Sequence, residues 1–104
     1  GVWAQRLVEA GGGLRASGDS VHLSCRASGI AFGNYAVWWY RQARGGTLEW
    51  VSVIWYDSSV IRYGPAVQGR ATVSRDDSRS ESSLSLNALQ PGDSGRYFCA
   101  VHTG

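Results

Sequence analysis

Residues 21–27 read VHLSCRA, a run in which apolar and polar residues alternate without interruption. Alternation with a period of two is typical of a β-strand that has one face in the core and the other in water. Within this run Cys25 falls on the same face as Leu23, so we expect both side chains to point inward. The stretch therefore predicts a half-buried strand that carries a cysteine into the core.

Similar short runs recur on either side of a series of turns. Strands are expected over residues 37–42, 48–56, 71–74, 82–86 and 95–99. The segments between them carry turn residues, such as DSS at 57–59 and RDDS at 75–78. Short strands at intervals of about ten residues predict an all-β antiparallel sandwich. At most one short helical turn is expected, between residues 87 and 94.

Length and composition narrow the class of protein further. A chain of 104 residues is the usual size of one domain, and a hydrophobic content of 43% excludes a disordered chain. No apolar run approaches the roughly 18 residues of a membrane span, so no membrane insertion is expected. The net charge of +2 is small and scattered, so a nucleic-acid partner is not expected either. No secretory leader is visible, and we expect any such leader to have been removed.

The two cysteines, Cys25 and Cys99, lie far apart in the sequence. Zinc sites usually contain closely spaced cysteine doublets, and the only histidines here are His22 and His102. We therefore expect no metal and no cofactor. A disulfide between two distant strands fits this spacing better, and it indicates an oxidising compartment.

The alternation also assigns a face to each residue near the cysteines. If Cys25, Trp39 and Cys99 point inward, one outward face carries aromatic and apolar side chains around a glutamine: Tyr40, Gln42, Leu48, Trp50 and Phe98. A monomer seldom leaves such a patch in water, so the pattern favours a partner interface. The alternative is that a loop or a missing strand covers the patch.

Three elements together resemble the signature of an immunoglobulin variable domain: Cys25, Trp39 fourteen positions later, and Cys99 at the end of YFC. The stretches LVEAGGGL at 7–14, LSCRASG at 23–29, LEWVS at 48–52 and VSRD at 73–76 are similar to an antibody heavy-chain variable domain. The resemblance covers about residues 4–101. It implies an immunoglobulin V-type two-sheet antiparallel sandwich, one domain over residues 1–104, with residues 1–3 as an N-terminal extension.

The resemblance implies a disulfide between Cys25 and Cys99 with Trp39 packed on it. It also implies three further structural residues: Arg70 paired with Asp93 near Arg41 and Glu49, and Tyr97, whose hydroxyl would bond back toward residues 90–93.

Antigen binding is the function that the resemblance implies. The hypervariable loops would be residues 30–36, residues 53–62 and a third loop after Ala100. The residues expected to contact antigen are Asn34, Tyr35, Trp55, Tyr56, Asp57, Ser58, Arg62 and His102. Tyrosine and tryptophan supply large rigid contact areas, and serine and asparagine supply adaptable hydrogen bonds. Buried supports are expected at Phe32, Ile54 and Trp38, and the antigen would be a macromolecule, either a protein or a glycan.

The resemblance assigns the outward aromatic face to pairing with an antibody light-chain variable domain. Leu48 and Trp50 keep the pattern of paired domains. Tyr40 departs from it, because valine is usual there and an aromatic residue is also seen in camelid single-domain antibodies. A T-cell-receptor-like or single-domain antigen receptor is therefore the alternative. Either protein would be extracellular, secreted or part of a receptor ectodomain.

Other departures bear on stability and on the end of the chain. Ala71 and Ser82 replace large apolar residues at inward positions, and such changes typically cost about 2–5 kcal/mol in a packed core. The family continues beyond the last residues seen here, so the resemblance predicts a sandwich without its final strand and a third loop truncated after residue 100. The strand that carries Cys99 would then have an open edge.

Enzyme activity is not expected. Serine, histidine and aspartate residues are present, but no Gly-x-Ser-x-Gly motif orders them into a catalytic site. His22 would lie on the outward face of its strand, in water.

Overall fold

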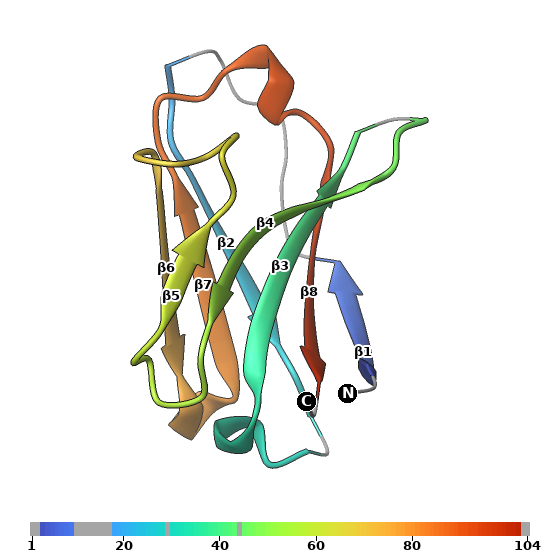
Figure 1. The fold of residues 1–104 in the computed structure, drawn as a ribbon, viewed down its shortest axis with the longest axis vertical. Coiled ribbons are helices and arrows are strands. Elements are labelled where there is room, and N and C mark those ends of the chain that lie inside the picture. The colour runs from blue at the N-terminus through green and yellow to red at the C-terminus, as the bar shows by residue number, and fades with distance from the viewer. Residues whose placement is uncertain (1–2, 10–17, 29, 44, 103–104) are drawn as a thin grey trace.

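The computed structural model describes residues 3–9, 18–28, 30–43 and 45–102, which form eight strands in two layers (Figure 1). One sheet has five strands in the order β1 (Trp3–Glu9), β8 (Arg96–His102), β3 (Ala36–Gln42), β4 (Leu48–Ile54) and β5 (Ile61–Tyr63). The other has three, in the order β2 (Val21–Arg26), β7 (Glu81–Leu86) and β6 (Ala71–Asp76). Every pairing is antiparallel, which confirms the predicted two-sheet sandwich.

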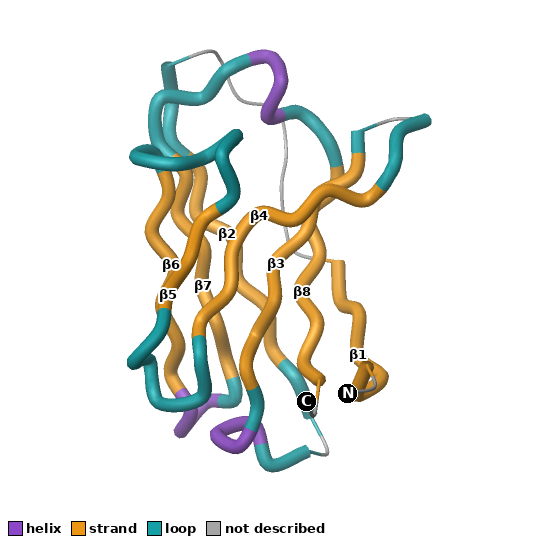
Figure 2. The backbone as a smooth tube through the Cα atoms, in the orientation of Figure 1, coloured by secondary structure: helices purple, strands orange, loops and turns teal. Residues whose placement is uncertain are grey.

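Three short 3-10 turns interrupt the strands: η1 (Phe32–Asn34), η2 (Asp77–Arg79) and η3 (Pro91–Asp93) (Figure 2). The last lies in the segment where one helical turn is predicted. It begins with a proline, whose fixed backbone angle suits the first helical position. The Asp93 carboxylate accepts a hydrogen bond from the Gln90 backbone N–H at 2.8 Å, and the Asp93 N–H donates to the Gln90 carbonyl at 2.9 Å.

The edge of β8 that faces away from β3 is paired with β1. Leu7 lies opposite Ala100, and Glu9 lies opposite Phe98. The expectation of an open edge beside Cys99 is therefore wrong, because β1 fills this position. The strand also continues past the residue where the third loop was expected to start, and it ends at His102. Residues 103–104 lie outside the described part of the chain.

The core lies between the two sheets and follows the predicted alternation. Leu23 and Cys25 on β2 are each 2% exposed, and Trp39 on β3 is fully buried. The predicted disulfide between Cys25 and Cys99 is present and joins the two sheets, with 6.3 Å between the Cα atoms. The strand faces that were predicted from the sequence are thus confirmed at the centre of the fold.

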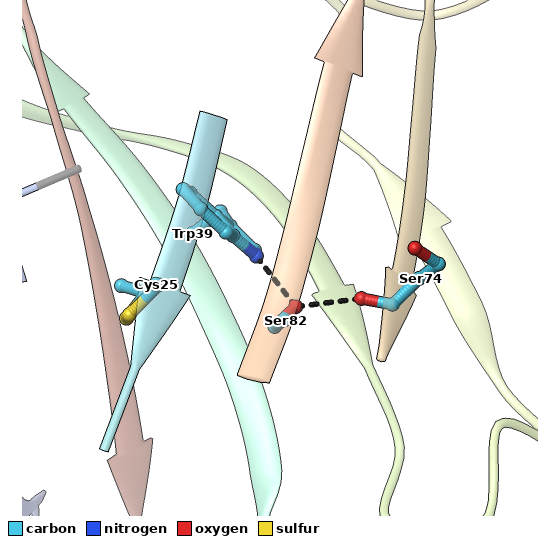
Figure 3. The surroundings of a disulfide bond; sticks show 5 residues. Cys25, Trp39, Ser74 and Ser82 are labelled. Carbon is cyan, nitrogen blue, oxygen red and sulfur yellow. Dashed lines mark hydrogen bonds between the residues drawn. A yellow bond between two sulfur atoms is a disulfide. The ribbon is translucent and has the colours of Figure 1, made fainter. Parts of the chain in front are cut away.

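At Ser82 a buried hydrogen-bonded hydroxyl takes the place of the large apolar side chain that was expected at this inward position. Its side chain is completely buried on β7. The Trp39 indole N–H donates to Ser82 Oγ at 3.2 Å, and the serine hydroxyl donates to the Ser74 carbonyl at 2.8 Å (Figure 3). The hydroxyl therefore has both a donor and an acceptor. It also provides the acceptor for the indole N–H, the one polar group of the Trp39 side chain.

A network of charged side chains closes the end of the sandwich that carries η3. Asp93 pairs with Arg41 Nη1 at 2.9 Å and with Arg70 Nη1 at 2.7 Å. Arg41 Nε also donates to Glu49 at 2.7 Å, and the Tyr97 hydroxyl donates to the Asp93 carbonyl at 2.7 Å. Arg41, Glu49 and Tyr97 come from the five-stranded sheet, whereas Arg70 directly precedes β6 of the other sheet and Asp93 lies in η3, so the network links the two layers at this end.

Burial opposes ionisation of the Asp93 carboxyl, but its hydrogen bonds outweigh that effect. The donors are Arg70, the backbone N–H of Gln90 and Arg41, and together they hold the pKa of Asp93 at about 2. Burial likewise disfavours the charged form of Arg41, yet its bonds to Tyr97, Glu49 and Asp93 raise its pKa above the ordinary arginine value. The pair is therefore ionised at neutral pH.

Candidate functional site

One end of the sandwich brings together three segments that are distant in the sequence: η1, the turn between β4 and β5, and η2 (Figure 1). The first two belong to the predicted hypervariable loops, residues 30–36 and 53–62. The third, the turn between β6 and β7, was not predicted to lie at a binding site. Together these segments form the loop end of the molecule.

The turn between β4 and β5 is tied closed by its own backbone. The Trp55 N–H donates to the Val60 carbonyl at 2.9 Å, and the Ser58 N–H donates to the Trp55 carbonyl at 3.0 Å. Ser58 adopts a left-handed conformation with φ of 65°. Trp55 is 38% exposed and Tyr56 48% exposed, so the turn presents both aromatic side chains to solvent.

Four other predicted contact residues are exposed at this end: Asn34 in η1, Asp57 and Ser58 in the β4–β5 turn, and Arg62 on β5. The Asp57 carboxylate accepts a hydrogen bond from the Ser59 N–H at 3.0 Å. Hydrogen bonds from the side chain and backbone of Ser59 lower the pKa of Asp57 below its ordinary value. This carboxylate is therefore charged throughout the physiological pH range.

Not every predicted contact residue lies on this surface. Tyr35 is half-buried and packs against the core, which favours a supporting position. The side chain of His102 lies outside the described part of the structure. Of the expected supports, Phe32 and Ile54 are buried as predicted, whereas Trp38 is only partly buried.

Arg75 on β6 connects the three segments of the loop end. Its guanidinium donates to the Phe32 carbonyl at 2.9 Å and to the Trp55 carbonyl at 2.8 Å, and it pairs with Asp77 at 2.7 Å. It also lies 4.9 Å from the centre of the Phe32 ring, within range of a cation–π interaction. The side chain is only 3% exposed, so a nearly buried charge supports both predicted loops.

Sequence reasoning did not single out Arg75, although a signal was present. The period of two places position 75 on the same face as Val73, which is buried. A charged residue at an inward position needs partners within the fold, and here carbonyl groups and Asp77 supply them.

The second candidate surface is the outer face of the five-stranded sheet. Register places Tyr40 on β3 directly opposite Trp50 on β4 and Phe98 on β8. Gln42 lies opposite Leu48 at the end of the same ladder. The five residues predicted for a partner interface are therefore brought together, and we call them the pairing face.

The pairing face is largely apolar at its surface. Leu48 is 44% exposed, and the three aromatic side chains are partly buried. The Trp50 indole N–H donates to the Ser52 carbonyl at 3.0 Å, and the Gln42 amide donates to the Gly46 carbonyl at 3.0 Å. Burial raises the pKa of the Tyr40 phenol, so this group stays neutral.

The sequence of residues 14–104 matches the family model of the immunoglobulin V-set domain. The chain belongs to the immunoglobulin V-set family. V-set domains are extracellular, generally non-enzymatic binding domains, which typically pair with another variable domain and bind macromolecular ligands. In this V-set domain the loop end and the pairing face are the candidate surfaces for those contacts.

The outer face of the three-stranded sheet carries His22, which was predicted to lie on an outward strand face. His22 is exposed there, with Nδ1 2.9 Å from Ser85 Oγ. The described residues contain no group of three or more side chains that could hold a metal ion. They also include no helix that is long and apolar enough to cross a bilayer.

Proposed function

We propose that this V-set domain is the variable domain of an antibody heavy chain. It binds a macromolecular antigen, a protein or a glycan, through the loop end, and it pairs with a light-chain variable domain through the pairing face. The parent protein is secreted or is part of a cell-surface receptor.

The observation that carries the proposal is the continuity of the pairing face across β3, β4 and β8. Tyr40, Trp50 and Phe98 are register neighbours, and Leu48 projects beside them with 44% of its surface exposed. Such apolar patches on a small domain mark interaction sites. A flat face built on strands suits a second variable domain of similar architecture.

The loop end supports antigen binding because it combines exposed aromatic residues with short polar side chains. Trp55 and Tyr56 offer large contact areas with few rotatable bonds, and Ser58 and Asn34 can adapt their hydrogen bonds to a ligand. The backbone beneath Trp55 is held by Arg75 Nη1 at 2.8 Å. Binding therefore requires little further ordering of this segment.

Pairing is tested by mixing the purified chain with a κ light-chain variable domain and measuring the dissociation constant by sedimentation. We expect a one-to-one complex that Leu48→Glu weakens by about tenfold or more, because a charge would be buried at the interface. The matched control is Ser24→Glu, which places the same charge on the exposed face of β2 and should leave the affinity unchanged. Equal affinity of the unmodified chain and Leu48→Glu would contradict the proposal.

One observation favours a second candidate, a single-domain or T-cell-receptor-like antigen receptor. The Gln42 amide N–H and the Trp50 indole N–H each donate to a carbonyl within the chain, and Tyr40 adds an aromatic side chain to the same face. A domain that functions unpaired needs such a self-contained face. The sedimentation experiment distinguishes the two, since this candidate predicts a soluble monomer that does not respond to the light-chain domain.

A further inference from the structure

The turn between β4 and β5 is held by hydrogen bonds within itself and from Arg75. Two backbone hydrogen bonds close it, from Trp55 to Val60 and from Ser58 to Trp55. Arg75 holds the Trp55 carbonyl from below at 2.8 Å. A segment fixed in this way presents its side chains in a defined arrangement before a ligand arrives.

Three consecutive residues of this turn, Trp55, Tyr56 and Asp57, are exposed, and we call them the aromatic–acid tip. In the described part of the chain, two of the three exposed large hydrophobic side chains belong to this tip. Tryptophan and tyrosine rings attract cations through their faces, and a carboxylate attracts them by direct charge. A cation is therefore the one kind of ligand group that all three side chains of the tip attract.

The charges around the tip are compatible with this complement. Arg75 is the arginine whose charge acts most on Asp57, but it is nearly buried and pairs with Asp77 at 2.7 Å. Asp76 is exposed at the end of β6. Arg62 is exposed on β5, where its Nη1 donates to the Ile61 carbonyl at 3.2 Å. The Asp57 carboxylate itself is hydrogen-bonded locally by Ser59, whose backbone N–H donates to it at 3.0 Å.

We propose that the aromatic–acid tip binds a cationic side chain, lysine or arginine, on a protein antigen. The inference rests on the proposed antigen-binding function and names the chemistry that the β4–β5 turn recognises. A neutral sugar would also stack on an aromatic ring, but it would gain nothing from the charge of Asp57. The charged carboxylate that follows the two exposed aromatic residues thus favours the cation.

The test uses the whole chain labelled with ¹⁵N and titrated with N-acetyl-arginine amide as the probe, while the Trp55 indole and the amides of residues 55–59 are followed by NMR. We expect saturable shifts at the tip. Asp57→Asn should weaken the apparent affinity by about threefold or more, the range of an exposed cation–π and charge contact. Asp76→Asn removes a neighbouring exposed carboxylate and is the matched control, with no change expected beyond a small screening effect.

Two parallel titrations use N-acetyl-glutamate amide and methyl glucoside. No shift at the tip with the arginine probe, or equal shifts with the glutamate or sugar probe, would overturn the proposal. Such a result would leave the pairing experiment unaffected, because the pairing face does not include the tip. Failure of this inference and failure of the proposed function are therefore distinguishable.

Discussion

Ser82 shows how this core accommodates a polar side chain where a large apolar one was expected. Its hydroxyl lies between the Trp39 indole and the Ser74 carbonyl, and both contacts are within hydrogen-bond distance. Buried polar groups are tolerated when they are paired, and the cost arises when one partner is removed. The same reasoning applies to Asp93, whose carboxylate is satisfied by two arginines and a backbone N–H.

We expect Ser82→Ala to lower the free energy of unfolding by about 1–3 kcal/mol, because the buried indole N–H of Trp39 would lose its acceptor. Urea denaturation followed by fluorescence measures this difference. Ser85→Ala serves as the control, since Ser85 bonds to the exposed His22 and its loss should change stability by less than about 0.5 kcal/mol. Equal effects of the two substitutions would show that the hydrogen bond to Trp39 does not stabilise the core.

The lowered pKa of Asp93 predicts how the free energy of unfolding responds to acid. Its folded-state pKa of about 2 lies below the value of an unfolded aspartate near 3.9, so the unfolded state binds its proton first as the pH falls. The stabilisation, on the order of 2 kcal/mol, is fully present above pH ~4 and is lost as the pH falls toward ~2. Unfolding free energies measured across this range check the slope.

The comparison variant for this measurement is Asp93→Asn. It should be less stable at pH 7, because Arg41 and Arg70 lose the charge that compensates them. It should also lose less stability than the unmodified chain between pH 4 and 2. Parallel pH profiles for the two proteins would exclude Asp93 as the source of the acid sensitivity.

Strands with one clearly buried face were predictable from the sequence, whereas the two edge strands of the five-stranded sheet were not. β2, β3 and β7 alternate strictly because one face of each is buried. β5 has only three residues, and β1 carries no strict alternation, so neither leaves a clear period in the sequence. Both lie at an edge of the five-stranded sheet.

The candidate site was predictable to a similar extent. The pairing face follows from alternation on β3 together with register, so its residues could be assembled from the sequence. The proximity of η2 to the predicted loops could not, because it depends on a contact between distant strands. The resemblance indicated which loops would contact antigen. That Arg75 connects them is seen only in the structure, where its guanidinium donates to the Phe32 and Trp55 carbonyls.

Replacing Arg75 should loosen both predicted loops. Arg75→Gln removes the ion pair to Asp77 and the charged donor to the Phe32 and Trp55 carbonyls. We expect amide hydrogen exchange at Ser58 and Tyr35 to accelerate by about tenfold, because local opening would cost less. Arg79→Gln is the control, since Arg79 lies in η2 with Asp77 and its side chain is 62% exposed. Faster exchange in only one of the two loops would contradict a shared support.

At the scale of the whole molecule, the fold separates its two candidate surfaces. The loop end gathers η1, η2 and the β4–β5 turn, whereas the pairing face lies along the side of the five-stranded sheet (Figure 1). The disulfide and Trp39 hold the two sheets together at the centre. A partner bound to the pairing face therefore leaves the loop end open to a ligand.

NMR mapping of the ¹⁵N-labelled chain with an unlabelled κ light-chain variable domain tests that claim most directly. We predict that the amides of Tyr40, Leu48, Trp50 and Phe98 shift or broaden, while those of residues 55–59 and the exposed residues of β2 remain unchanged. Perturbations centred on the β4–β5 turn, or on the outer face of the three-stranded sheet, would contradict it.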